Sequence, residues 1–127
     1  MYKEEIILAS PPYKTLNDVL IYRKNQQPND IAYRFLINDE ESETITYAEL
    51  YKRVYQLGTH IQNVTKPLDR VILAAKPGFD FIIGFFACLI TRRIAVPIFP
   101  PANSVMANRF LHVLNNANPS LILCDKQ

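Results

Sequence analysis

Side chains that could carry out catalysis are few and widely separated in this sequence of 127 residues. The two histidines, His60 and His112, fall in different predicted helices, and neither has a serine or cysteine at a spacing typical of an activated nucleophile. The two cysteines, Cys88 and Cys124, each lie inside an apolar run without a Cys or His partner at zinc-ligand spacing. We therefore expect both thiols to be buried and reduced, as in cytosolic proteins.

Motifs that bind phosphate groups are also absent from the sequence. Only three glycines occur, and they form neither the G-x-G-x-x-G pattern of dinucleotide-binding folds nor a P-loop. The aspartates of the second half, Asp69, Asp80 and Asp125, are interpreted as turn, helix-cap and strand-end residues. The residues alone therefore assign no catalytic, cofactor-binding or metal-binding position.

The segment from Arg70 to Pro101 has the pattern of a parallel β-α-β unit. A short apolar strand is predicted over Arg70–Ala75, a helix over Phe79–Ile90 and a second strand over Ile94–Phe99. Continuous apolar runs of this length are typical of strands covered on both faces. Arg92-Arg93 follows the helix, where positive charge is favourable at the negative end of the helix dipole.

The remaining predicted elements are helices and strands that add to this unit. An acidic turn joins two predicted strands as a hairpin, and T-x-x-[DE] capping patterns open two of the helices. These elements are helices over Leu16–Asn25, Thr46–Val64 and Ser104–Asn116, and strands over Ile31–Ile37, Glu43–Thr46 and Leu121–Cys124. We predict an α/β fold with a mostly parallel sheet of about five strands, flanking helices and an antiparallel hairpin at the sheet edge. Residues 1–14 are expected to be an extended lead, and residues 15–127 a single subdomain.

The helix Phe79–Ile90 is apolar on almost every side, and Phe81, Phe85 and Phe86 account for much of its surface. These rings are either packed core or the wall of a pocket for a fatty-acyl chain. Core packing is favoured, because buried helices are common and apolar pockets are few. The helix is too short to cross a membrane, which requires about 20 apolar residues.

The charge balance argues against nucleic acid as a partner, since the net charge is only +2. It is unevenly distributed, with seven Lys and Arg against nine Asp and Glu in residues 1–64, and seven against three in residues 65–127. A positive second half could attract an anionic ligand, but a solvated surface is the favoured interpretation.

Several of these segments resemble one enzyme family, in order and in spacing. They are YRFL at residues 33–36, TYAEL at 46–50, DRV at 69–71, FFACL at 85–89 and IAVPIFPP at 94–101. Together they are similar to the N-terminal portion of fatty acyl-AMP ligases, from about Thr15 to Cys124. These are adenylate-forming enzymes related to acyl-CoA synthetases, luciferases and the adenylation domains of peptide synthetases.

The resemblance implies a function that this segment would serve only in part. The family uses ATP and magnesium to convert a fatty acid to an acyl-adenylate, and passes the acyl group to the phosphopantetheine arm of an acyl carrier protein. The family's phosphate loop, ribose-binding acidic residue and C-terminal lid lie later in its chain and do not occur here. We therefore expect a first subdomain that binds no cofactor itself, is inactive alone, associates with the remainder of the ligase and self-associates through uncovered apolar surface.

Two alternatives to a ligase subdomain remain open. The chain could be a stand-alone, non-catalytic α/β module, derived from such a ligase, that binds a partner or carrier protein through its apolar edge. A complete small nucleotide-binding enzyme is the third interpretation, and the missing phosphate loops argue against it.

The sequence departs from the family pattern where glycine is common and this chain has Leu68, Ala87 and Arg92. A glycine that follows a helix provides a left-handed backbone conformation, which costs other residues about 1–2 kcal/mol. The resemblance therefore implies either a strained backbone at Arg92 or a changed loop after this helix.

Overall fold

The structure, a computed structural model, describes residues 14–125. In chain order its elements are α2 (Leu16–Gln26), β1 (Ile31–Leu36), β2 (Ser42–Thr46), α3 (Tyr47–Val64), β3 (Arg70–Ala74), α4 (Phe79–Ile90), β4 (Ile94–Pro97), α5 (Ser104–Ala117) and β5 (Leu121–Cys124). Every predicted helix and strand of this part is present, with ends that differ from the predicted ones by at most two residues. The expected extended lead lies, except for Lys14, outside the described residues. No helix in residues 14–125 has the length and apolar character needed to cross a bilayer.

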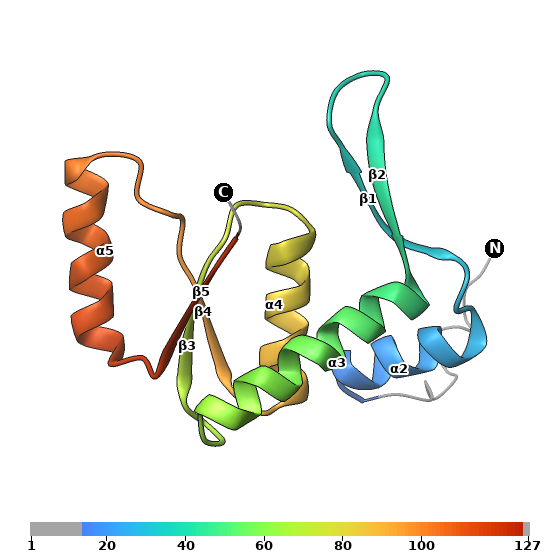
Figure 1. Cartoon of the computed structure of the whole chain (residues 1–127), viewed down its shortest axis with the longest axis horizontal. Coiled ribbons are helices and arrows are strands. Elements are labelled where there is room, and N and C mark those ends of the chain that lie inside the picture. The colour runs from blue at the N-terminus through green and yellow to red at the C-terminus, as the bar shows by residue number, and fades with distance from the viewer. Residues whose placement is uncertain (1–13, 126–127) are drawn as a thin grey trace, which may run out of the picture.

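Three parallel strands form the main sheet, in the order β4-β3-β5. The central strand pairs on both sides, so that Ile72 lies opposite Val96 in one neighbour and Ile122 in the other. Helices α3 and α4 cover one face of the sheet and α5 lies over the other, as the view along the sheet shows (Figure 1). The predicted α/β class and the predicted parallel sheet are both confirmed.

The hairpin of β1 and β2 is antiparallel, as predicted, but it forms a separate two-stranded sheet. It projects away from the body of the molecule beyond α3 and α4 (Figure 1). Its base is held by backbone bonds, in which the Tyr47 and Ala48 N–H groups donate to Asp30 and Pro28. The five described strands thus belong to two sheets, whereas a single sheet was predicted. The reason is that α3 follows β2 directly and directs the hairpin away from β3.

The core lies between α3, α4 and the central strand. Leu50, Val54 and Ile61 form the inner stripe of α3 and are at most 1% exposed, as their helical spacing predicts. On α4, a Cβ atom built at Gly84 would lie 2.6 Å from Cδ1 of Leu73 in β3. Glycine at this position therefore allows α4 to approach the sheet closely.

Both predicted N-terminal caps are present, in different forms. Thr15 and Asp18 form a reciprocal capping box at the start of α2. At α3, the Thr46 hydroxyl accepts from the Glu49 N–H at 3.2 Å, while the Glu49 carboxylate pairs with Arg53 at 3.0 Å. Each helix therefore begins at a residue that the sequence identifies.

A left-handed residue precedes each strand of the parallel sheet. They are Leu68 (φ 70°), Arg92 (φ 62°) and Asn118 (φ 48°), before β3, β4 and β5 respectively. Asparagine tolerates this conformation, whereas leucine and arginine are strained in it. The strain implied at Arg92 is confirmed, and Leu68 shares it, but Ala87 is buried within α4 and needs no special backbone conformation.

The turn after α4 is a Schellman motif that contains a non-glycine residue. The Arg93 N–H donates to the Cys88 carbonyl at 2.8 Å, and the Arg92 N–H donates to the Leu89 carbonyl at 3.1 Å. The Arg92 carbonyl in turn accepts from the Leu68 N–H at 2.8 Å. The two strained turns are therefore hydrogen-bonded to each other.

Arg93 joins the ends of two helices from a buried position. Its side chain is only 7% exposed. Nε donates to the Thr65 hydroxyl at 2.9 Å, Nη2 to the Thr65 carbonyl at 2.8 Å, and Nη1 to the Thr91 carbonyl. Thr65 and Thr91 are the C-cap residues of α3 and α4. Arg93 thus makes the predicted favourable contact between a cation and a helix end, and it does so with two helices at once.

Replacing Arg92 by glycine is expected to stabilise the chain by about 1 kcal/mol, because glycine adopts a positive φ without steric cost. The measurement is the free energy of unfolding in urea. Arg109→Gly is the matched control: its backbone is helical and its side chain exposed in α5, so the same replacement should destabilise by about 1 kcal/mol. Loss of stability in Arg92→Gly would contradict the strain assigned to this turn.

Candidate functional site

An apolar cavity opens where the parallel strands end. Its volume is about 250 Å³, and it is lined by Ala75, Pro77, Phe81, Pro97, Ile98 and Phe99. The lining comes from the turn after β3, the first turn of α4 and the segment after β4. In open α/β sheets, ligands bind at this carboxyl edge. Because the described lining has no ionisable or hydroxyl side chain, the cavity can hold an apolar group but cannot transfer a proton.

Local sequence explains the shape of this cavity. Pro77 and Gly78 turn the chain from β3 into α4, and the φ of proline is fixed near −65°. Pro97 at the end of β4 and the Pro100-Pro101 pair after it keep the backbone extended. The Ile98 N–H still donates to the Leu73 carbonyl at 3.0 Å, which holds this exit beside the central strand.

The three phenylalanines predicted as core or pocket wall are placed differently by the structure. Phe81 lines the cavity at the carboxyl edge. Phe85 lies parallel to it, with ring centroids 6.4 Å apart, and contacts Phe86 edge-to-face at 5.9 Å. Phe86 lines a different cavity, beside α2. The rings therefore form a continuous aromatic row between two cavities, and a role as an acyl-pocket wall stays a prediction.

The sequence pattern alone does not identify Pro97, Ile98 and Phe99 as cavity residues. The predicted strand runs to Phe99, whereas β4 ends at Pro97, so Ile98 and Phe99 lie in the segment that follows it. Phe99 is 69% exposed, so it forms part of the rim. The signal that could have found them is the carboxyl-edge rule, because residues directly after neighbouring parallel strands lie together.

Charged side chains surround an adjoining pocket of about 260 Å³, lined by Glu43, Arg53, Lys76, Pro77, Gly78, Phe79, Asp80 and Asp125. Three carboxylates offset its two cations. The Asp125 carboxylate accepts the Lys76 backbone N–H at 3.1 Å, which links the ends of β3 and β5. A triphosphate requires an excess of cations and backbone donors, so this arrangement does not fit one. Residues 14–125 also contain no group of three or more side chains suited to hold a metal ion.

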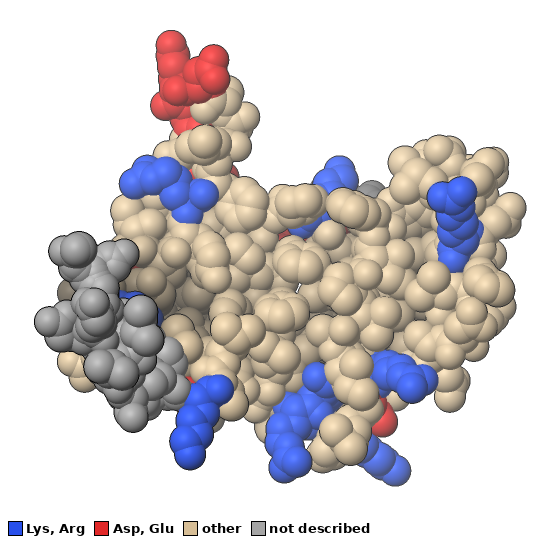
Figure 2. All heavy atoms as spheres, turned by 180° about the vertical axis from the view of Figure 1, so that it is seen from behind, with Lys and Arg blue, Asp and Glu red and all other residues tan. Residues whose placement is uncertain are grey.

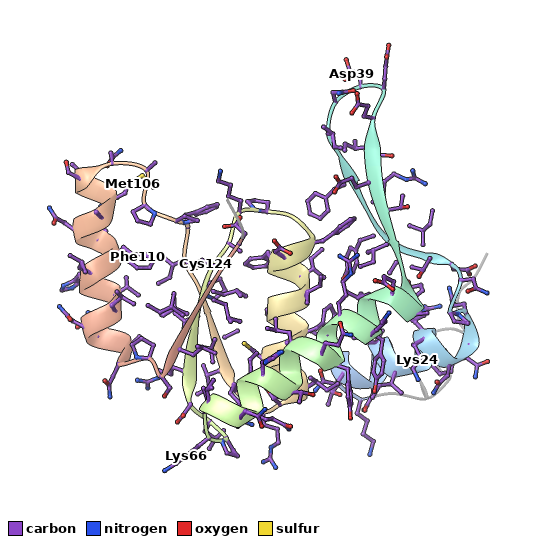
Figure 3. The ribbon with its side chains drawn as sticks, viewed as in Figure 1. Lys24, Asp39, Lys66, Met106, Phe110 and Cys124 are labelled. Atoms are coloured by element: carbon purple, nitrogen blue, oxygen red, sulfur yellow. The ribbon has the colours of Figure 1, made fainter. Side chains whose placement is uncertain are left out.

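Charges elsewhere on the surface do not form a single site. Figure 2 shows the acidic turn, Asp39, Glu40 and Glu41, at the end of the projecting hairpin, and separate lysine and arginine side chains on both the hairpin side and the opposite side of this face. Figure 3 places Asp39 at that tip, and Lys66 at the opposite end of the molecule. This spacing supports the prediction of a solvated basic surface.

The two cysteines differ from each other, contrary to the expectation that both are buried. Cys88 is buried in α4, and burial raises the pKa of its thiol to about 11, with the nearby Arg93 charge acting in the opposite direction. Cys88 is therefore a packed thiol rather than a nucleophile. Cys124 is exposed, on the same face of β5 as the exposed Ile122, since exposure alternates along this strand. Both thiols are free.

The histidines are not brought together. His60 lies on the exposed face of α3, as predicted. His112 is exposed on α5, where its Nε2 lies 3.2 Å from Nδ2 of Asn116. No nucleophile lies beside either ring within the described part of the chain.

Comparison with known proteins gives consistent matches. A family model described as "AMP-binding enzyme" matches residues 21–127. The chain is 37% identical over 97 residues to a long-chain-fatty-acid–AMP ligase, FadD32 of Mycobacterium marinum, covering 73% of this chain and 15% of the relative. It is 32% identical over 123 residues to the medium-chain-fatty-acid–[acyl-carrier-protein] ligase JamA of Moorena producens, covering 93% of this chain and 21% of that protein.

The fold is also that of a solved ligase structure. The crystal structure of fatty acyl-adenylate ligase from L. pneumophila, in complex with acyl adenylate and pyrophosphate, superposes with a TM-score of 0.81 and 33% identity. The match covers 96% of this chain and 21% of that one. This chain thus spans about a fifth or less of the length of these relatives.

Proposed function

Because the chain belongs to the AMP-binding enzyme family and corresponds to the N-terminal part of a fatty acyl-AMP ligase, we propose that it provides an apolar wall for the acyl chain. The observation that carries this proposal is the cavity at the carboxyl edge, whose described lining is entirely apolar. Burial of a fatty-acyl chain there would contribute about 0.8 kcal/mol for each CH₂ group removed from water. Phe81, Pro97 and Ile98 are the residues proposed to contact it.

In this proposal the chemistry belongs to the intact ligase. It would join a fatty acid and ATP to form the acyl-adenylate and pyrophosphate, with Mg²⁺ to neutralise the triphosphate. Transfer of the acyl group to the phosphopantetheine arm of an acyl carrier protein would follow, and the similarity to JamA, an acyl-carrier-protein ligase, supports an acyl carrier protein as the acceptor. We propose a cytoplasmic location, which two free cysteines support.

The second candidate is a stand-alone, non-catalytic interaction module. Large apolar side chains on the α5 side of the sheet support it, because Leu111 is 56% exposed and Ile122 is 43% exposed. Strand β5 also has one unpaired edge in the described part of the chain. Such an edge can accept another strand.

The acyl-wall proposal predicts selective photolabelling of the chain. Palmitate that carries a diazirine on its tail is expected to label the peptide containing Phe81 or the segment Pro97–Phe99, because both line the cavity. Ile98→Asp should reduce this labelling at least fivefold, since a carboxylate opposes an apolar tail. The measurement is peptide mapping by mass spectrometry.

Ile122→Asp is the matched control, because it places the same charge on an exposed apolar residue outside the cavity and should leave labelling unchanged. The same preparation should show no ATP–pyrophosphate exchange with palmitate, because the described residues do not fit a triphosphate. Labelling spread evenly over the chain would contradict the proposed acyl contact in this cavity. Exchange clearly above the blank would contradict the proposal that adenylation requires the intact ligase.

We also expect the chain alone to self-associate, because the free edge of β5 and the apolar residues beside it lack a cover. Sedimentation velocity at rising concentration should show growth of species larger than the 14.6 kDa monomer. Replacing Leu111 and Ile122 by lysine should reduce this growth. If the chain stays monomeric over the whole concentration range, the free edge of β5 is not a surface through which it self-associates.

A further inference from the structure

A second cavity lies apart from the carboxyl edge of the sheet. Its volume is about 300 Å³, and it is lined by Leu16, Val19, Leu20, Arg23, Ala32, Tyr33, Tyr47, Leu50 and Phe86. It shares no described lining residue with the first cavity. Helix α2 runs beside α3 below the base of the hairpin, and the cavity lies where these elements and α4 meet (Figure 1).

The cavity combines an apolar interior with one cation. Leu20 and Leu50 are buried at 4% and 1% exposure and form the floor with Phe86. Arg23 is half-buried in the last turn of α2. Residues 14–125 contain one salt bridge, which joins Arg53 to Glu49. Within this part of the chain, no carboxylate lies at ion-pair distance from Arg23. A partly buried cation without a counter-charge favours an anion in the space beside it.

Arg23 is held in position by a neutral group. Its Nη1 donates to Oε1 of Gln27 at 2.8 Å, and Nε2 of Gln27 donates to Oδ2 of Asp30 at 3.2 Å. The glutamine thus separates the Asp30 carboxylate from the guanidinium. Because a guanidinium carries five N–H donors, this contact leaves others for a ligand.

Two tyrosines add polar groups to the same cavity. Burial raises the pKa of Tyr33, and the neighbouring Tyr47 raises it further. Tyr33 therefore remains protonated at neutral pH and can donate its hydroxyl proton to an anion. No other charged side chain belongs to the described lining.

We propose that this cavity binds a small monocarboxylate with an apolar body, with the carboxylate on Arg23 and the Tyr33 hydroxyl and the body against Leu20, Leu50 and Phe86. One cation fits one negative charge, and the guanidinium matches a carboxylate in two-point geometry. The volume is at the lower end for ligand sites, which limits the body to about six carbons. The site is additional to the acyl wall and does not depend on it.

The test is a titration of the full ¹⁵N-labelled chain with hexanoate, followed by amide chemical shifts. Saturable shifts are expected at Leu20, Ala32 and Leu50, which line the cavity. Hexylamine has the same body and the opposite charge, and it should produce at least tenfold weaker shifts at these amides. Absence of saturation with hexanoate, or equal response to hexylamine, would overturn the proposal.

Variants separate a binding role from a structural one. Arg23→Gln should weaken hexanoate binding at least tenfold, whereas Arg23→Lys, which keeps the charge but loses the two-point geometry, should weaken it less than Arg23→Gln does. Arg34→Gln is the matched control, because Arg34 is exposed on β1, bonds to Ser42 and does not line the cavity. Unchanged affinity in Arg23→Gln, or an equal loss in Arg34→Gln, would contradict the assignment of Arg23.

Discussion

The buried guanidinium of Arg93 is the interaction on which the arrangement of this chain depends. It has no carboxylate at ion-pair distance among the described residues, and its charge is instead met by carbonyl and hydroxyl oxygens of Thr65 and Thr91. These residues end α3 and α4, where the helix dipoles place partial negative charge. One side chain therefore fixes the ends of two helices against each other, directly before β4 begins.

The same end of the sheet contains the strained backbone. Leu68 and Arg92 are left-handed and bonded to each other, and Arg93 follows immediately. Strain of this kind persists only where the surrounding structure compensates for it. The three bonds of the Arg93 side chain provide such compensation. The consequence reaches the opposite edge, because fixing the starts of β3 and β4 also fixes where they end, and the apolar cavity lies between those ends.

Most of the helices and strands could be predicted from the sequence, because each has a clear hydrophobic period and a cap or turn residue at its ends. The position of the hairpin could not, since a hairpin pattern does not say which sheet it joins. Phe81 was identified from the apolar character of its helix, but Pro97, Ile98 and Phe99 became cavity residues only once the strands were aligned. Arg93 was expected near a helix end. Its burial depends on Thr65, which is 28 residues earlier in the chain.

The free energy of unfolding of Arg93→Met tests the central role of this residue most directly. Methionine fills similar space without donors, so the oxygens of Thr65 and Thr91 lose their partner, and we predict a loss of about 3 kcal/mol. Arg92→Met removes the same charge from the adjacent exposed position and should change stability by less than about 0.5 kcal/mol. If Arg93→Met were as stable as Arg92→Met, the buried guanidinium would not be the interaction that holds this fold together.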